Sequence, residues 1–163
     1  MTFDKPVIFL DFDDVMATTH QYYGKKRHPV FNTVYPFDPK CVKVLNSIID
    51  VTNPIIICSS DWKLHHTLEQ LNQIFEWNGV NAKIADITPS LWGVKYFRLQ
   101  ELEDCRAEEI KLFANNNNII NFVAVDDLNL FKWLPDNFVH CTRPNEGIKQ
   151  SGVKDKILKI LMK

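Results

Sequence analysis

Three short segments of the sequence concentrate the side chains that could do chemistry. They are Asp11-Phe-Asp13-Asp14, Ser59-Ser60-Asp61 and Asp126-Asp127, and each follows a short apolar run. Asp11 and Asp13 are two residues apart, so on an extended chain their side chains lie on the same face. One carboxylate can accept a phosphoryl group as a nucleophile, while a second protonates the departing oxygen and later activates water. On these residues alone, a polar turn after a strand is an equally good interpretation of Asp-x-Asp-Asp.

The number of carboxylates in these segments predicts a bound cation. Like charges gathered at one edge of a sheet repel each other unless a cation joins them. Surroundings made only of oxygen atoms and rich in carboxylates favour a hard ion such as Mg²⁺, which also pairs with a substrate phosphate. We therefore expect Mg²⁺ as the cofactor.

Short apolar runs predict the strands that must position these segments, at residues 6–10, 55–58, 82–87, 122–125 and 138–141. Helical patterns separate or follow them, beginning at Asp38-Pro39, covering Leu68 to Phe75 up to a stop at Asn78-Gly79, covering about 103–114, and running from Val153 to Leu161. This alternation predicts an α/β fold: a doubly wound, Rossmann-like, mainly parallel sheet with helices on both faces. In such sheets ligands bind beyond the carboxyl ends of the strands.

One stretch, residues 17–37, has no clear period and is too long for an ordinary loop between a strand and a helix. We expect it to be an insert over the carboxyl end of the first strand. Within it, Lys25, Lys26 and Arg27 follow Tyr22-Tyr23, and such a mixture of cations and rings could hold a nucleic-acid end. A solvated loop whose tyrosines pack back on the domain is the alternative interpretation.

Length and composition indicate a globular protein. With 163 residues we expect a single domain spanning 1–163, and 45% hydrophobic residues are too many for a disordered chain. A net charge of −1 removes the general electrostatic argument for a nucleic-acid or membrane-surface binder, although a local basic patch is compatible with it. No apolar run approaches the roughly 20 residues of a membrane span. The first residues lack the pattern of a signal peptide, and the four cysteines show no CxxC pair, so we expect a cytoplasmic protein without membrane contact or structural zinc.

Three further interpretations concern single residues. Cys58 lies inside an apolar run, which predicts a buried thiol rather than a nucleophile. Trp62 is expected to pack beneath the loop that begins at Ser59, and His65-His66 to be a pair at a helix end rather than the start of a metal site. Nothing in the sequence indicates an obligate protein partner.

Taken in order, the three polar segments resemble motifs of the haloacid dehalogenase (HAD) superfamily. Residues 8–16 resemble its first motif, an apolar strand followed by Asp-x-Asp-x-Val/Thr, while 55–59 and 123–127 resemble its second and fourth motifs. A closer likeness is to small, nearly capless HAD domains, including those found in multidomain RNA-repair proteins. It depends on residues 59–63, similar to Ser-Ser-x-Trp-Arg, and 106–110, similar to Arg-x-x-Glu-Ile, with Lys63 in place of the expected Arg.

This resemblance implies a role for each motif residue. Asp11 would be the nucleophile and a magnesium ligand. Asp13 would be the general acid and base, and its main-chain carbonyl would also bind the metal. Ser59 would donate a hydrogen bond to a phosphoryl oxygen, and Asp126, with Asp127 directly or through water, would complete the metal site.

The resemblance also requires a cation beside the nucleophile, near a helix start. Arg106 is the first choice, because a helix begins there, with Lys95 and Arg98 as rivals. Asp14 stands where Gly is common in the family; Asp tolerates unusual backbone angles, but it adds a negative charge near the metal. Ser60 is a further candidate for substrate binding, together with the basic residues of 17–37.

The expected function is a Mg²⁺-dependent phosphomonoester hydrolase that acts through an aspartyl-phosphate on Asp11. No large cap is evident between the motifs, which favours a phosphorylated substrate of some size, such as a polynucleotide phosphate end. A small phosphorylated metabolite is the second choice. A catalytically silent phosphate- or partner-binding domain is an alternative suggested by Asp14, and a metal-independent dehalogenase is another, against which Asp126-Asp127 argues.

Overall fold

The computed structural model describes residues 3–19 and 26–163. Its centre is a five-stranded sheet in the order β3-β2-β1-β4-β5, in which every neighbouring pair is parallel. The strands are β1 (Val7–Leu10), β2 (Ile55–Cys58), β3 (Ile84–Ile87), β4 (Phe122–Asp126) and β5 (Phe138–His140). The prediction of a doubly wound parallel sheet is therefore confirmed, with every strand end within two residues of the expected one.

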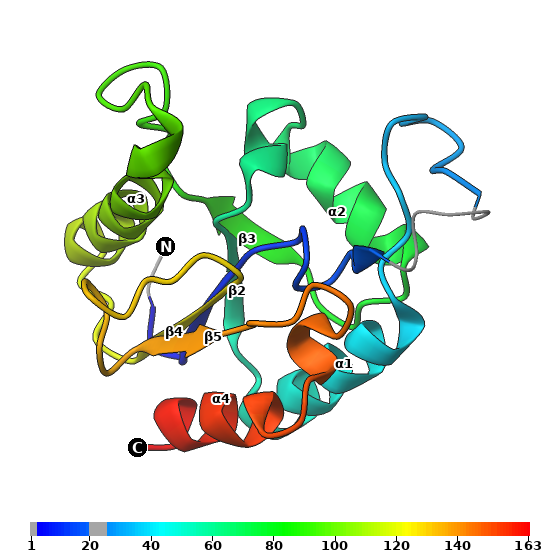
Figure 1. Ribbon diagram of the computed structural model, residues 1–163. Coiled ribbons are helices and arrows are strands. Elements are labelled where there is room, and N and C mark those ends of the chain that lie inside the picture. The colour runs from blue at the N-terminus through cyan, green and yellow to red at the C-terminus, as the bar shows by residue number, and fades with distance from the viewer. Residues whose placement is uncertain (1–2, 20–25) are drawn as a thin grey trace.

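Helices cover both faces of the sheet, but unequally (Figure 1). Side chains of α1 (Pro39–Thr52), α2 (Leu68–Trp77) and α4 (Val153–Leu161) pack on one face, and those of α3 (Leu102–Asn116) pack on the other. The short 3₁₀-helices of the described residues are η2 (Asp61–Leu64), η3 (Leu99–Glu101) and η4 (Gly147–Lys149). None of the α-helices in the described part of the chain has the length and apolar character that crossing a membrane requires.

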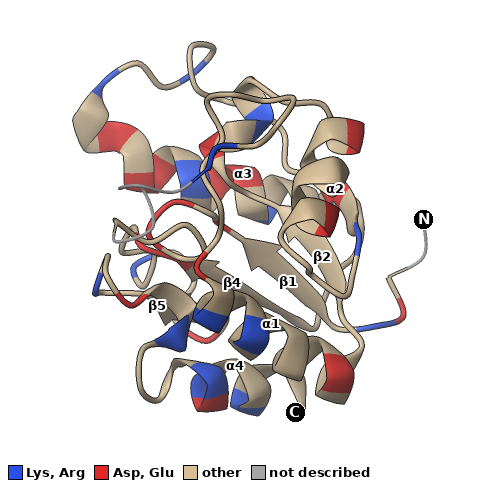
Figure 2. Cartoon of the chain, turned by 90° about the vertical axis from the view of Figure 1, so that its right-hand side faces the viewer, with Lys and Arg blue, Asp and Glu red and all other residues tan. Residues whose placement is uncertain are grey.

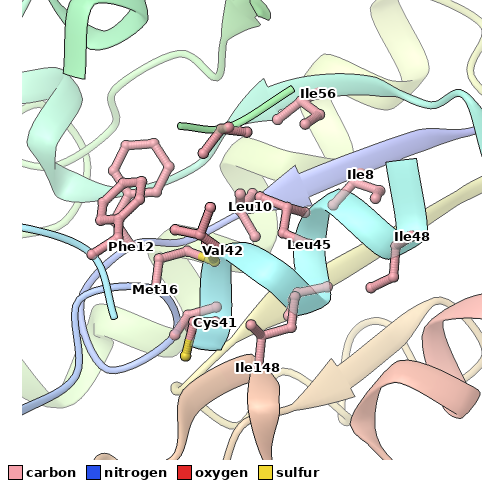
Figure 3. Close-up of a cluster of buried hydrophobic side chains, with 14 of the residues drawn as sticks. Ile8, Leu10, Phe12, Met16, Cys41, Val42, Leu45, Ile48, Ile56 and Ile148 are labelled. Atoms are coloured by element: carbon pink, nitrogen blue, oxygen red, sulfur yellow. The ribbon is translucent and has the colours of Figure 1, made fainter. Parts of the chain in front are cut away.

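The strands are apolar on both faces because both faces are covered. In β1, Ile8 and Leu10 belong to the cluster formed with α1, α2 and α4, while Val7 and Phe9 belong to the cluster formed with α3. Figure 3 shows Ile8 and Leu10 packed beside Leu45 of α1. Each such side chain contributes roughly 1.5–3 kcal/mol when it is fully buried.

The helix ends follow the local sequence. Asp38 caps α1 by accepting a hydrogen bond from the Lys40 N–H at 2.8 Å, and Pro39 occupies the first helical position. Thr67 and Gln70 form a capping box at the start of α2. After α2 the chain turns at Gly79, whose φ of 74° favours glycine, as the expected stop at Asn78-Gly79 requires.

The described part of the predicted insert packs on the domain beside α2. Val34 and Phe37 are buried, and so is His28, whose Nδ1 accepts hydrogen bonds from the N–H groups of Val30 and Phe31, both at 3.1 Å. The His28 ring also stands edge-on to Trp77 at the end of α2, with centroids 4.8 Å apart. This part of the insert is therefore fixed by buried side chains and by ring contacts.

Candidate active site

The register of the sheet places three of the candidate residues in one row. Leu10 pairs with Cys58 of β2 and with Val125 of β4, so the next residues along are Ser59, Asp11 and Asp126. Two backbone hydrogen bonds continue the ladder across this row, from Ser59 N–H to the Leu10 carbonyl and from Asp11 N–H to the Val125 carbonyl, both at 3.1 Å. The row lies at the carboxyl edge, between β1 and β4, where the strand order reverses and ligands bind in such folds.

Three carboxylates meet at this row. Asp11, Asp126 and Asp127 each offer an oxygen, and these oxygens lie within 4.8 Å of one another. Figure 2 shows acidic segments gathered where β4 ends. Burial and the neighbouring negative charges raise the pKa of Asp127 to about 8, and burial and the charge of Asp11 raise that of Asp126. An oxygen-only set whose charges repel in this way fits Mg²⁺, because the ion would remove the repulsion.

Arg106, on the first turns of α3, reaches this cluster from the other side of the row. Its Nη1 lies 2.6 Å from Asp126 and 3.3 Å from Asp11, and its Nη2 lies 3.0 Å from Asp61. The guanidinium is buried, and the three carboxylates hold its pKa well above the ordinary value. Both buried carboxylates that Arg106 touches therefore have a fixed positive charge beside them.

The two rival cations lie elsewhere. The Lys95 Nζ pairs with Glu108 at 2.6 Å in an exposed position. Arg98 caps the start of η3, where its N–H donates to the Glu101 carboxylate at 3.0 Å. Of these three candidates, the structure places Arg106 beside the predicted nucleophile.

A second buried ion pair, between Lys63 and Glu109, holds the elements that carry the site together. Lys63 Nζ lies 2.5 Å from the Glu109 carboxylate and 2.8 Å from the Thr88 hydroxyl, and the side chains of Lys63 and Glu109 are 2% and 3% exposed. The other Glu109 oxygen accepts the N–H of Leu91 at 2.7 Å. This network joins η2, the segment after β3 and α3, and so fixes the helix that presents Arg106.

Lys63 and Glu109 belong to two separate motifs of the sequence, and their pairing was not predicted. One signal was available: Arg106 and Glu109 are three residues apart, which places them on the same face of a helix. If Arg106 faces the carboxylates, then Glu109 must face the protein interior too, and a buried acid requires a cation. The lysine substitution at position 63 retains that cation.

Asp13 lies outside the carboxylate cluster, and its side chain is exposed. Its Oδ2 accepts a hydrogen bond from the indole N–H of Trp62 at 2.9 Å, a contact that sequence analysis missed. Trp62 packs against Phe12 and Phe37, with centroids 5.4 and 5.9 Å away, so the indole that orients Asp13 is itself anchored. This placement is compatible with proton transfer by the Asp13 carboxyl, and the metal contact expected of its main-chain carbonyl stays a prediction.

Asp14 adopts the left-handed backbone conformation, which favours glycine and which Asp tolerates better than most residues. Its φ is 55°, and its carboxylate accepts a hydrogen bond from the Thr19 hydroxyl at 3.2 Å. Burial and the charge of Asp11 raise its pKa. The turn after β1 is also held by η4, since Ile148 donates to the Val15 carbonyl at 2.9 Å, and a Cβ on Gly147 would lie 2.2 Å from that oxygen.

The two serines after β2 have different surroundings. The Ser59 hydroxyl is buried, and among the described residues it has no hydrogen-bond partner. An unsatisfied buried hydroxyl costs free energy unless a ligand or water pairs with it. The Ser60 hydroxyl is buried as well, but it caps η2 by accepting the Trp62 N–H at 3.4 Å. Ser59 is therefore the serine available to a ligand.

The described basic residues of the insert, Lys26 and Arg27, are not among the residues that line the hollow at the carboxylates. Lys26 and Arg27 are exposed, and the Arg27 guanidinium donates to the Tyr35 hydroxyl at 2.8 Å. Lys25 and the pair Tyr22-Tyr23 lie outside the described residues.

The remaining single-residue predictions can be compared with the structure directly. All four cysteines are free and buried, and burial raises the pKa of the Cys58 thiol to about 12, as expected for a core residue. His65 ends η2, and neither it nor His66 belongs to the one cluster of metal-ligating side chains found among the described residues.

A small hollow of about 110 Å³ opens on the site. Its lining residues come from the ends of β1 and β4, from η2 and from α3: Asp11, Asp13, Asp61, Leu102, Arg106, Asp127 and Leu128. The predicted nucleophile, the predicted general acid and the buried arginine thus border one space.

The comparison with protein families agrees with this geometry. Residues 7–153 match the model of the HAD domain in Swiss Army Knife RNA repair proteins. Neither the curated proteins nor the solved structures gave a significant match. Because the family match covers most of the chain and includes every strand and the predicted motif residues, the chain belongs to the HAD superfamily, in the family of HAD domains in Swiss Army Knife RNA repair proteins.

Proposed function

We propose that this protein is a Mg²⁺-dependent phosphomonoester hydrolase that forms an aspartyl-phosphate on Asp11. The observation that supports this most directly is the meeting of Asp11, Asp126 and Asp127 within 4.8 Å, beside the buried Arg106. Membership of the HAD superfamily indicates a HAD-type hydrolase. The metal, the reaction and the substrate are the parts that we propose.

The site residues divide the work of binding an anion. Asp11, Asp126 and Asp127, with the main-chain carbonyl of Asp13, would hold Mg²⁺, which supplies positive charge against the phosphate and the nucleophile. Arg106 offsets the remaining charge of Asp11, and the Ser59 hydroxyl donates to a phosphoryl oxygen. This role would satisfy the buried hydroxyl that has no partner among the described residues.

The reaction has two steps. An Asp11 oxygen attacks phosphorus, the bond from phosphorus to the leaving oxygen breaks, and the protonated Asp13 gives its proton to that oxygen. Asp13, now a carboxylate, removes a proton from water, whose oxygen attacks phosphorus and releases inorganic phosphate from Asp11. Trp62 holds Asp13 by its indole N–H and so fixes the carboxyl that moves the proton in both steps.

For the substrate, we propose the phosphorylated end of a polynucleotide. The family is described by its occurrence in RNA repair proteins. The hollow at the carboxylates measures about 110 Å³, which suits a phosphoryl group, so we propose that the molecule that bears this group extends beyond the hollow. A small phosphorylated metabolite is the second candidate, and the two differ in how the group beyond the hollow is bound.

An aryl phosphate assay tests the reaction. We expect turnover with Mg²⁺, loss of turnover with EDTA, and loss in the Asp11→Asn variant; after acid quenching, mass spectrometry should locate the phosphoryl group on Asp11. Tight binding of phosphate without turnover would instead indicate a silent binding domain. Turnover that resists EDTA would exclude the metal-dependent mechanism.

A further inference from the structure

A second and larger depression lies beside the hollow of the site. It measures about 590 Å³ and is lined by the part of the insert that follows His28 and by η2 with the two residues after it: Thr33, Val34, Tyr35, Trp62, His65 and His66, together with Asp13. Asp13 is the residue that borders both spaces. We call the larger space the Asp13 groove.

The position of Asp13 decides which part of a substrate enters this groove. In the proposed reaction Asp13 gives its proton to the leaving oxygen, so the group attached to that oxygen must lie on the Asp13 side of the phosphoryl group. Because Asp13 also borders the groove, the leaving group extends from the hollow into the groove. The groove is therefore the place where substrates of different chemistry would be distinguished.

The groove walls consist largely of rings. The Trp62 indole and the His66 imidazole lie 6.3 Å apart between centroids, and Tyr35 and His65 complete the set. Burial, with His65 and His28 nearby, lowers the pKa of His66, which favours the neutral form of its ring. Planar rings of this kind stack on nucleic-acid bases, and this stacking depends little on which base is bound.

One arginine brings a positive charge to the edge of the groove. Among the described residues that line it, Asp13 is the single carboxylate. Arg27 lies over the Tyr35 ring, with its guanidinium carbon 4.9 Å from the ring centroid, and brings a fixed positive charge to that wall. Rings for a base and an arginine for a neighbouring phosphate are the combination by which single-stranded nucleic acids are bound.

We propose that the Asp13 groove binds the terminal base of a polynucleotide whose end phosphate is removed at Asp11. This proposal rests on the phosphatase function proposed above. Tyr35 and His65 are the residues that stack on the base, while Arg27 neutralises the next phosphate along the strand. The groove would recognise the presence of a terminal base. A strand with its phosphate at the 5′ end and a strand with its phosphate at the 3′ end both present such a base.

A matched pair of substrates tests the proposal. Two short single-stranded oligonucleotides, each with one terminal phosphate, differ only in whether the terminal nucleotide carries adenine or is abasic; 5′- and 3′-phosphorylated versions distinguish the two ends. We expect kcat/KM to be about tenfold or more higher for the adenine substrate at one of the two ends. Combined Tyr35→Ala and His65→Ala changes should bring the ratio close to one, whereas Phe97→Ala, an exposed ring outside the groove, should retain it.

Binding measurements keep the test independent of turnover. With Asp11→Asn protein and Mg²⁺, fluorescence anisotropy should show the adenine oligonucleotide bound about tenfold more tightly than the abasic one. Equal affinities for the two would overturn the groove proposal, and turnover of the abasic substrate would then leave the phosphatase function standing. A phosphotyrosine peptide that outcompetes the adenine oligonucleotide would overturn it in favour of a protein substrate.

Discussion

The two faces of the sheet are built differently. On the face covered by α1, α2 and α4, the buried residues of α1 are apolar: Cys41, Val42, Leu45, Ile48 and Ile49. On the other face, the buried residues of α3 include Arg106 and Glu109 in its first turns and Ile110, Phe113 and Ala114 farther along. Asp11 and Asp126 turn toward α3 because they continue the parity of Phe9 and Ala124, which belong to that face.

This difference separates stability from chemistry. Apolar side chains of similar volume can replace each other at a modest cost in stability, so the α1 face should tolerate such substitutions. The start of α3 tolerates little, since each of its buried charges depends on particular partners and loses them if one is removed. One helix therefore serves the site with its first half and the core with its second.

Removal of Arg106 should have the largest effect on stability, because it disrupts the buried charges at the start of α3. Arg106→Ala leaves Asp11 and Asp126 without their cation, and we expect a loss of about 3–5 kcal/mol in the free energy of unfolding, measured with urea in EDTA. The loss should shrink as pH falls, since the buried carboxyls can then take up protons. Lys132→Ala, which removes an exposed pair with Asp104, should change stability by less than about 1 kcal/mol. Equal effects of the two substitutions would contradict the structure.

A large-to-small change at Leu45 tests the apolar face. Leu45 is fully buried in α1, and Leu45→Ala should cost about 2–5 kcal/mol through lost burial and a cavity. Turnover per folded molecule should stay unchanged, because Leu45 packs in the apolar cluster, whereas Asp11 meets Arg106 on the other face of the sheet. Val51→Ala on the exposed side of the same helix is the control. A fall in kcat at a temperature where the Leu45 variant is folded would show that the two faces are coupled.

Removal of Mg²⁺ tests how far the proposed metal site contributes to the stability of the charged face. At a Mg²⁺ concentration 100 times its Kd, the free energy of unfolding should rise by about 2.7 kcal/mol. Asp127→Asn should abolish most of that gain and also stabilise the metal-free protein, because it removes one of the carboxylates whose mutual repulsion raises the Asp127 pKa. Asp136→Asn, at an exposed position, should retain the gain. If NaCl of the same ionic strength stabilised the protein equally, the site would not be a specific metal site.

Asp38 tests a polar network at the start of α1. Its carboxylate caps α1 and pairs with Lys149 and with the Thr18 hydroxyl, so Asp38→Ala should cost about 1–2 kcal/mol by thermal or urea unfolding. Asp38→Asn retains an acceptor for the cap and should lose less. A larger loss for Asn than for Ala would exclude capping as the reason for an acid at this position.

The smallest effect is expected from His28, where the apolar face meets the insert. Burial lowers the pKa of His28 from its ordinary value of 6.5, so between neutral pH and pH 5 the unfolded chain binds a proton that the folded chain does not. Stability should therefore fall as pH drops through this range. His28→Asn should reduce that slope, and the remainder belongs to His66, whose pKa is lowered too, and to the opposing carboxyls.

Comparison of wild type with the His28 variant, by urea unfolding at several pH values in the same buffer, isolates the contribution of this histidine from that of Asp127. Identical slopes would mean that His28 is solvated in the folded protein.

Much of the fold could be predicted because it depends on local patterns. Doubly apolar runs, the cap at Asp38-Pro39 and the stop at Asn78-Gly79 each specify an element through nearby residues. The parallel order of the strands then predicts that their carboxyl ends meet. The proximity of Asp11 and Asp126 follows from that geometry, so it could be predicted without knowledge of any tertiary contact.

What the sequence determined by itself was the set of chemical groups at the strand ends and the elements that position them. Only the tertiary structure decided that Arg106 rather than Lys95 or Arg98 lies beside Asp11, that Lys63 pairs with Glu109, and that Trp62 holds Asp13. The physical reason is that strand ends are fixed by backbone register, whereas a long side chain finds its partner through the packing of whole helices. The groove beside Asp13 likewise exists only where the insert and η2 are brought together in space.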